Sequence, residues 1–169
     1  TMRELLGDEV PWVATHPLFG PASLARGERP LAVVVCPNAM HPRAVDAVRA
    51  LYARIGCDVV LQDADAHDRA MAQTHALAFF VAKGLLDIGA GQNVPFSPPS
   101  FRAMARTIEA VRADAGHLFS AIQRENPHAQ AARTRLIDAL ETIDEALARV
   151  GEGDVAAPSA FEIPDFGDK

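Results

Sequence analysis

The residues best placed to do chemistry near the start of the chain lie at 15–21, in the string THPLFGP. Histidine is the side chain that most readily accepts a proton near neutral pH. A short apolar run at 12–15 precedes His16 and favours a strand, and a rigid strand would aim the imidazole. The two prolines and the glycine also suit a fixed turn that His16 merely caps. Spacing alone leaves both interpretations open, a proton acceptor or a turn.

A second candidate is the pair His67 and Asp68, with His75 eight residues after His67. All three lie on a predicted helix, where an acid in the first turn complements the helix dipole. In the simpler interpretation, Asp63 or Asp65 caps this helix and His67 is a solvated surface residue. His75 lies among apolar residues, where a buried imidazole needs polar partners. It is therefore either a satisfied core residue or a ligand contact.

A third candidate is a group of arginines, Arg102, Arg106 and Arg112, on another predicted helix. Arg102 and Arg106 are four residues apart, so they share a helix face. Two guanidinium groups on one face can bind a dicarboxylate through paired hydrogen bonds. An ordinary solvated face is the alternative interpretation.

The elements that must position these residues begin with a strand, a helix and a second strand. Residues 31–36 (LAVVVC) form a buried strand by their β-branched content. Apolar residues at helical spacing follow at 44–55, and Gly56 suits the end of that helix. Residues 58–62 (DVVLQ) predict the second strand. A helical crossover between two strands makes them parallel neighbours in most proteins.

After Asp63 the pattern is entirely helical. The fold class expected is mainly α, with a small N-terminal βαβ piece followed by a helical dimerisation domain. The segment 64–89 is apolar nearly all round, and burial of such a helix in a chain of this size usually needs a partner subunit. The predicted helices span 64–89, 101–113, 118–125 and 129–150.

Composition shifts divide the chain into three parts. Residues 1–63 form the βαβ segment that carries HPLFGP, and residues 64–150 form the all-helical dimerisation domain. Residues 151–169 are rich in glycine, proline and acids, which predicts a flexible acidic tail.

Charge and cysteine content narrow the class of protein. A net charge of −6 argues against a general nucleic-acid binder. No apolar run of about 18 residues occurs, so we expect no membrane span. Cys36 and Cys57 lie in apolar runs and are expected to be buried thiols. No metal-binding spacing of cysteine or histidine occurs, so no metal site is expected. These features favour a cytoplasmic protein.

Three strings, taken in order, resemble the prephenate/arogenate dehydrogenases of tyrosine biosynthesis. HPLFGP at 16–21 is close to the HPMFGP string of that family, and HDRAMAQTHAL at 67–77 resembles the stretch in which the family has HD and substrate-site polar residues. SPPSFRAMAR at 97–106 resembles the helix that brings arginine to the substrate. The resemblance runs from about residue 2 to residue 150 and implies the C-terminal substrate-binding and dimerisation half of such an enzyme.

The resemblance implies an NAD(P)-dependent oxidative decarboxylation of a cyclohexadienol, either prephenate or arogenate. In the family, hydride leaves the ring carbon that bears the hydroxyl for NAD or NADP, and loss of CO2 makes the ring aromatic. His16 would accept the hydroxyl proton, and the protein would be a homodimer through the helical domain. The other implied site residues are His67, His75, Arg102 and Arg106 for the substrate, and Pro17 and Gly20 for the cofactor.

The sequence departs from the family's pattern in three places. It has no Gly-x-Gly-x-x-Gly after a strand, since its Gly-x-Gly strings at 89–91 and 151–153 follow helices. We therefore expect the dinucleotide to bind mainly to a nucleotide domain not present in this chain, and the chain alone to be inactive. Phe79 stands where many prephenate-using members have histidine, which favours arogenate or relaxed specificity. Ala110 stands near the family's carboxylate-binding arginine, whose role would fall to Arg106 or Arg112.

Two other classes of function remain open. One is a non-catalytic dimerisation module that binds a cyclohexadiene or an aromatic amino acid without dinucleotide dependence. The other is a different enzyme that kept the pocket and uses its histidine without NAD. Dependence on a dinucleotide distinguishes the dehydrogenase from both.

Overall fold

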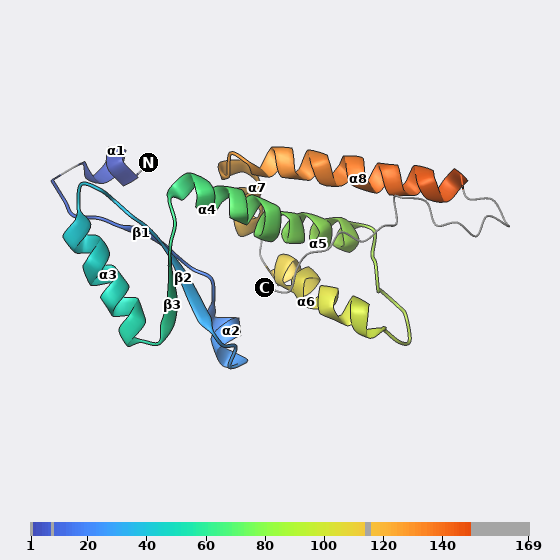
Figure 1. Ribbon diagram of the computed structural model, residues 1–169. Helices are drawn as coiled ribbons and strands as arrows, with labels where there is room; N and C mark the ends of the chain where they lie inside the picture. The colour runs from blue at the N-terminus through green and yellow to red at the C-terminus, as the bar shows by residue number, and fades with distance from the viewer. Residues whose placement is uncertain (1, 8, 114–115, 150–169) are drawn as a thin grey trace. The chain divides into compact units, whose positions relative to one another are not determined.

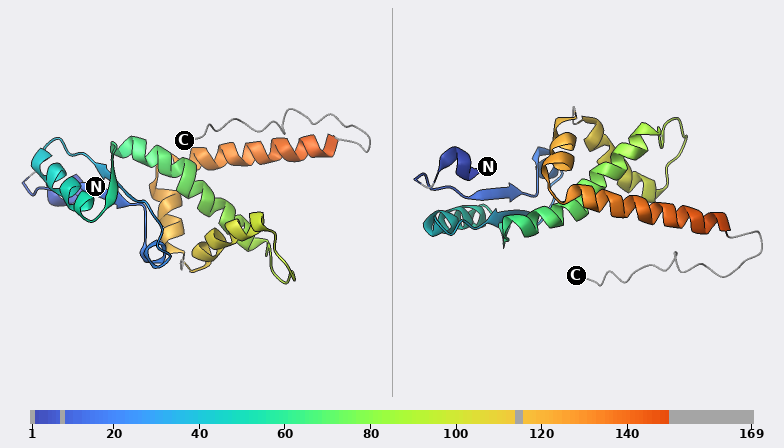
Figure 2. Two further views of the ribbon diagram at one scale, coloured as in Figure 1. Left: turned by 60° about the horizontal axis from the view of Figure 1, so that its bottom comes forward. Right: turned by 90° about the horizontal axis from the view of Figure 1, so that it is seen from above.

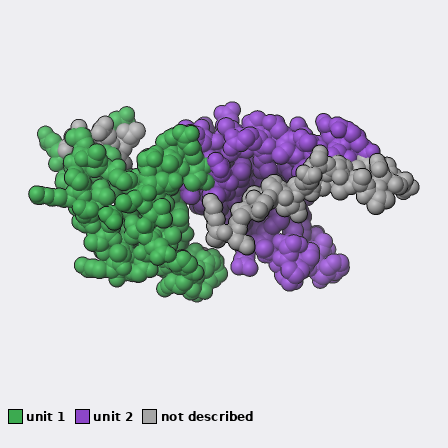
Figure 3. Space-filling view, viewed as in Figure 1, with its two compact units in different colours: residues 1–70 green, residues 71–169 purple. Residues whose placement is uncertain are grey.

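The computed structural model describes residues 2–7, 9–113 and 116–149, so the predicted tail at 151–169 lies outside the described residues. The chain divides into two compact units between Ala70 and Met71, coloured separately in Figure 3. The predicted boundary after residue 63 lies one short helix, residues 64–71, before this division. That the two parts have different functions stays a prediction.

The first unit is built on a three-stranded sheet (Figure 1). Its strands are β1 (Ala14–Pro17), β2 (Leu31–Cys36) and β3 (Cys57–Leu61), with β2 in the middle. β2 runs antiparallel to β1 and parallel to β3, which confirms the predicted parallel pair. The helices of this unit are α1 (Met2–Leu6), α2 (Pro21–Ala25), α3 (Pro42–Arg54) and α4 (Ala64–Met71).

The core of the first unit forms where α3 covers one face of the sheet. Val33 and Val35 of β2 are completely buried there, and Val45 of α3 packs with them. Alternation along β2 places Val34 on the opposite face. Burial of each valine side chain stabilises the fold by roughly 1.5–3 kcal/mol.

Two element boundaries fall at prolines. β1 begins two residues later than predicted and ends at Pro17, and an edge strand tolerates proline because its outward N–H needs no partner. α3 begins at Pro42, because proline suits the first helical turn. Gly56 has a φ of +80° just beyond α3, as the predicted end of that helix requires.

The second unit is entirely helical in its described residues (Figure 2). It contains η1 (Ala72–Ala76), α5 (Leu77–Asp87), α6 (Pro99–Ala113), α7 (His117–Glu125) and α8 (Ala129–Arg149). Its core joins α5 to α6 through the buried Ala82, Ile108 and Val111, with Phe79, Phe101 and Phe119 packed around them. The mainly α class with a small N-terminal sheet is confirmed.

The helix predicted at 64–89 is interrupted by a feature that the apolar pattern did not reveal. Residues 72–76 form η1, a π-helix, between α4 and α5. Along this stretch only Ala72, Ala76 and Ala82 are buried within the chain. The larger apolar side chains of α5 stay partly exposed, so the predicted burial on most faces is not reached within one chain.

Gly91 tests the packing of the loop between α5 and α6. Its φ is +77°, and a Cβ there would lie 2.7 Å from Cζ of Phe101. We predict that Gly91→Ala lowers the free energy of unfolding by at least about 1 kcal/mol, because the left-handed conformation and the ring both oppose a side chain. Gly84→Ala, inside α5 with nothing within 4 Å of the added Cβ, should raise it by about 0.5–1 kcal/mol. Urea titration measures the unfolding free energy of both variants. Equal effects would contradict the close packing of Phe101 against Gly91.

Candidate active site

A chain of two imidazoles and a carboxylate lies in the first unit. His16 Nδ1 is 2.8 Å from His67 Nε2, and His67 Nδ1 is 2.9 Å from Oδ1 of Asp68. The two rings meet edge to face, with centroids 5.1 Å apart and planes at 78°. The His67 side chain is only 15% exposed. The interpretation of His67 as a solvated surface residue is therefore wrong.

The sheet register and a capped helix bring these residues together across 51 positions of sequence. His16 of β1 pairs with Val34, the β2 residue whose side chain lies opposite the α3-covered face. Thr15, one residue earlier, lies within 3.4 Å of the Tyr52 hydroxyl of α3, which places His16 on the other face. α4 begins where Asp63 Oδ1 accepts from Ala66 N, so the predicted aspartate cap is confirmed at Asp63.

The carboxylates near this chain also act on a cysteine. Burial raises the pKa of the Cys36 thiol, and the negative charges of Asp68 and then Asp63 raise it further. Cys36 therefore stays a neutral thiol at the end of β2. The imidazoles are the groups in this cluster that are suited to move a proton near neutral pH.

The residues predicted for the cofactor side follow His16 directly. Pro17 is the last residue of β1, and Gly20 immediately precedes α2. A Cβ added to Gly20 would meet nothing within 4 Å, so packing within the chain does not demand glycine there. Their assignment to a cofactor stays a prediction.

In the second unit, His75 lies in the π-helix and has a buried ring nitrogen without a hydrogen bond. Its Nε2 is buried and finds no partner among the described residues, and its ring stacks at 4.6 Å on Phe79. Burial lowers the pKa of His75, so its neutral form is favoured. One ring nitrogen of His75 therefore lacks the hydrogen bond that a satisfied core residue would have, and its role as a ligand contact stays a prediction.

A buried polar group that the sequence did not reveal supports the π-helix. Gln123 of α7 is buried and donates its amide to the Ala76 carbonyl at 2.7 Å. Arg133 of α8 donates to both the side-chain and backbone oxygens of Gln123, and its guanidinium lies over the Phe80 ring. Periodicity gives no signal for such a network, since it joins three elements through side chains and backbone carbonyls that are far apart in the sequence.

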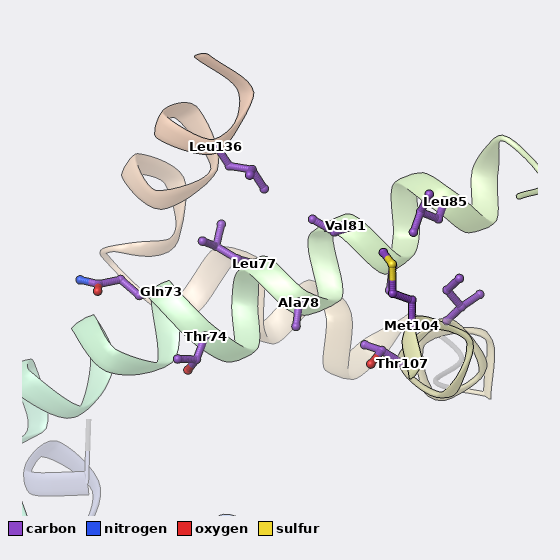
Figure 4. A pocket seen from close by; sticks show the side chains of 11 residues that line it. Gln73, Thr74, Leu77, Ala78, Val81, Leu85, Met104, Thr107 and Leu136 are labelled. Carbon is purple, nitrogen blue, oxygen red and sulfur yellow. The ribbon is translucent and has the colours of Figure 1, made fainter. Parts of the chain in front are cut away.

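An apolar groove of about 370 Å³ runs along α5 in the second unit (Figure 4). Leu77, Val81 and Leu85 line it from α5, Met104 from α6 and Leu136 from α8. The predicted substrate arginines lie on the same α6 helix. Arg102 and Arg106 are both exposed, and Arg102 donates to the Ser97 carbonyl at 2.8 Å.

Comparison with known proteins points to one group of enzymes. The 4-amino-4-deoxyprephenate dehydrogenase of Streptomyces pristinaespiralis is 33% identical over 151 residues, which cover 86% of this chain and 50% of the relative. The chain resembles prephenate and arogenate dehydrogenases. No family model matches the chain.

Two solved dehydrogenases share the fold. Prephenate dehydrogenase from A. aeolicus, in complex with hydroxyphenyl propionate and NAD+, aligns with a TM-score of 0.66 and 16% identity, over 91% of this chain and 57% of that one. Synechocystis arogenate dehydrogenase aligns with a TM-score of 0.57 and 19% identity, over 86% and 55%. The chain thus spans about half the length of the dehydrogenases that it matches.

The dinucleotide of such dehydrogenases finds no fitting cradle in the described residues. A dinucleotide phosphate needs a glycine-rich turn between a strand and the helix that follows it. The turns from β2 to α3 (residues 37–41) and from β3 to α4 (residues 62–63) contain no glycine, and the turn from β1 to α2 (residues 18–20) contains only Gly20, so none is glycine-rich. The glycines at 89 and 91 follow α5 and have no strand before them. No step of the reaction that uses the dinucleotide is therefore assigned to these residues.

The buried ring of His75 predicts a pH effect on stability. Because its pKa is lowered in the folded chain, the unfolded chain binds the proton more readily as the pH falls below 6.5. The neutral ring therefore contributes stability above pH 6.5 that is lost on acidification. We predict that, as the pH falls below 6.5, the unfolding free energy of the natural chain decreases relative to that of His75→Gln. A difference independent of pH would contradict the burial of the ring.

Proposed function

We propose that this chain is the substrate-binding and dimerisation half of a dehydrogenase that oxidatively decarboxylates a prephenate-type cyclohexadiene, with His16 as proton acceptor. The single observation that carries the proposal is the position of His16, the histidine of the HPLFGP string. It lies on a strand and is hydrogen-bonded to an imidazole that is itself bonded to a carboxylate. The similarity in sequence to a dehydrogenase over 86% of the chain supports the same reaction class.

The chemistry asked of this chain is to hold a substrate and to take one proton. A hydroxyl at the ring carbon that is oxidised must lose its proton as the carbonyl forms, and an imidazole nitrogen is suited to receive it. Loss of CO2 then makes the ring aromatic, and the oxygen recovers a proton. His16 therefore takes one proton from the substrate and returns it in each turnover, with NAD(P)+ as the hydride acceptor, bound mainly outside the described residues.

Substrate-binding roles are also proposed for three residues of the second unit. His75 has a buried Nε2 without a partner among the described residues, and Arg102 and Arg106 offer exposed guanidinium groups on α6 for a carboxylate. Phe79, whose ring stacks on His75, stands where many prephenate-using members of the family have a histidine. We propose that this apolar ring favours arogenate or relaxed specificity over strict use of prephenate.

The proton-acceptor role predicts a large effect of one substitution. In the natural full-length protein, His16→Asn should lower kcat by roughly 10²- to 10⁴-fold, because the amide cannot take a proton. The measurement is the appearance of reduced nicotinamide with NAD+ or NADP+, using prephenate, arogenate and 4-amino-4-deoxyprephenate in turn. His117→Asn, at an exposed histidine of α7, is the control and should leave kcat unchanged.

The outcomes of this assay separate the classes of function. Full activity in His16→Asn would contradict the proposed role of that residue. Binding of a substrate analogue without turnover by the natural protein, with either dinucleotide, would instead favour the non-catalytic binding module. Turnover without any dinucleotide would favour an enzyme that uses its histidine for another reaction.

We also propose that the second unit forms a homodimer through an apolar face of α8. Ile137, Leu140 and Leu147 are 41%, 53% and 56% exposed, and their spacing places them on one side of the helix. Leu136, beside them, lines the apolar groove that continues onto α5 and α6. A surface of large apolar side chains of this extent is typical of one covered by another subunit.

This interface predicts the result of changing two residues. Leu140→Lys together with Leu147→Lys should convert the dimer into a monomer, because two charges would be buried without partners. Light scattering during gel filtration measures the mass. Asp138→Lys, on the opposite side of α8, is the matched control and should keep the dimer. A double variant of unchanged mass would show that this face is not the interface.

A further inference from the structure

The order of hydrogen bonds through His67 determines where its two protons can be. The Asp68 carboxylate can only accept, so the 2.9 Å contact requires a proton on His67 Nδ1. In a neutral imidazole the other nitrogen then carries a lone pair. His67 Nε2 is therefore an acceptor as long as His67 is neutral.

The same rule extends to His16. Its Nδ1 lies 2.8 Å from the lone pair of His67 Nε2, so His16 Nδ1 must donate. In neutral His16 the lone pair is then on Nε2, the ring nitrogen on the side away from His67. We propose that Asp68 and His67 are positioning residues that hold His16 in the tautomer whose Nε2 accepts the substrate proton. This inference rests on the proposed function and assigns His67 a role other than binding the substrate.

The geometry also allows a proton to move on from His16 to His67. When His16 Nε2 takes a proton from a substrate hydroxyl, the O–H bond breaks, an N–H bond forms and His16 becomes an imidazolium. The proton on its Nδ1 can cross to His67 Nε2 over the 2.8 Å bond. His16 is then neutral, and the positive charge on His67 lies beside the negative charge of Asp68. The reverse transfers return one proton to the product oxygen, so protons balance over the cycle.

Both ring nitrogens of His67 are engaged in this arrangement. One is bonded to Asp68 and the other to His16, and the side chain is only 15% exposed. A residue that binds substrate directly needs a donor or acceptor that is not already bonded, which His67 lacks. The two histidines of the HDRAMAQTHAL string therefore take different roles.

The tautomers are measured without turnover, by nitrogen NMR of the ¹⁵N-histidine-labelled chain at neutral pH. The expected result is a proton on Nδ1 of both His16 and His67. Asp68→Asn should abolish this preference, because an amide can also donate to His67 Nδ1. Asp65→Asn is the matched control: it removes a carboxylate of the same helical turn that binds Arg69, and both tautomers should stay unchanged. A proton on Nε2 of neutral His16 in the natural chain would overturn the proposal.

Kinetics of the natural full-length protein then separate positioning from substrate binding. Asp68→Asn and His67→Phe should each lower kcat at least roughly 100-fold, as loss of a tautomer-setting group does in other enzymes, with KM for the substrate nearly unchanged. A rise in KM with kcat preserved would assign His67 to the substrate and overturn the proposal. Circular dichroism shows whether each variant folds. If a substitution unfolds α4, the tautomers measured by NMR in the natural chain decide instead. Absence of dehydrogenase activity in the natural protein would refute the proposed function alone, since the tautomers are read independently.

Discussion

The burial of β2 between two other strands is the constraint on which the candidate site depends. Val33 and Val35 must face α3 to form the core, and the strand period of two then directs Val34 to the opposite face. Because β1 pairs with β2 in register, His16 shares the side of Val34. A shift of one residue would place His16 against α3 and Thr15 opposite it. The position of the proposed proton acceptor is thus a consequence of how the valines are buried.

The first turn of α4 completes this arrangement through polar contacts. Asp63 caps the helix, and its next turn carries His67 and Asp68. In water, where each group is solvated, a carboxylate and an adjacent imidazole would interact only weakly. Beside His16, in a half-buried setting, their bonds are directional, and the carboxylate determines which nitrogen of each ring can carry a proton. Through two successive hydrogen bonds, the charge of Asp68 therefore determines which nitrogen of His16 can accept a proton.

The second unit depends on a different kind of interaction, a buried amide that satisfies an irregular helix. Gln123 donates to the Ala76 carbonyl of η1, and Arg133 donates to the side-chain oxygen of Gln123. His75 lies in the same π-helix and keeps an unsatisfied nitrogen. π-helical segments are rare and frequently occur at functional sites.

The sequence alone predicted the strands, the parallel crossover and the extent of the long helices to within a few residues, because apolar periodicity follows the faces that are buried, but it did not reveal the π-helix η1 within the segment 64–89. It also identified His16, His67, Asp68 and His75 as groups capable of chemistry, since residue type decides what can move a proton. The resemblance of three strings indicated the family that the comparisons then supported. Only the tertiary structure placed His16 beside His67, because their contact spans 51 residues and depends on strand register. Gln123 and Arg133 were likewise invisible in the sequence, because a buried polar residue gains its meaning from partners on other elements, which no local pattern records.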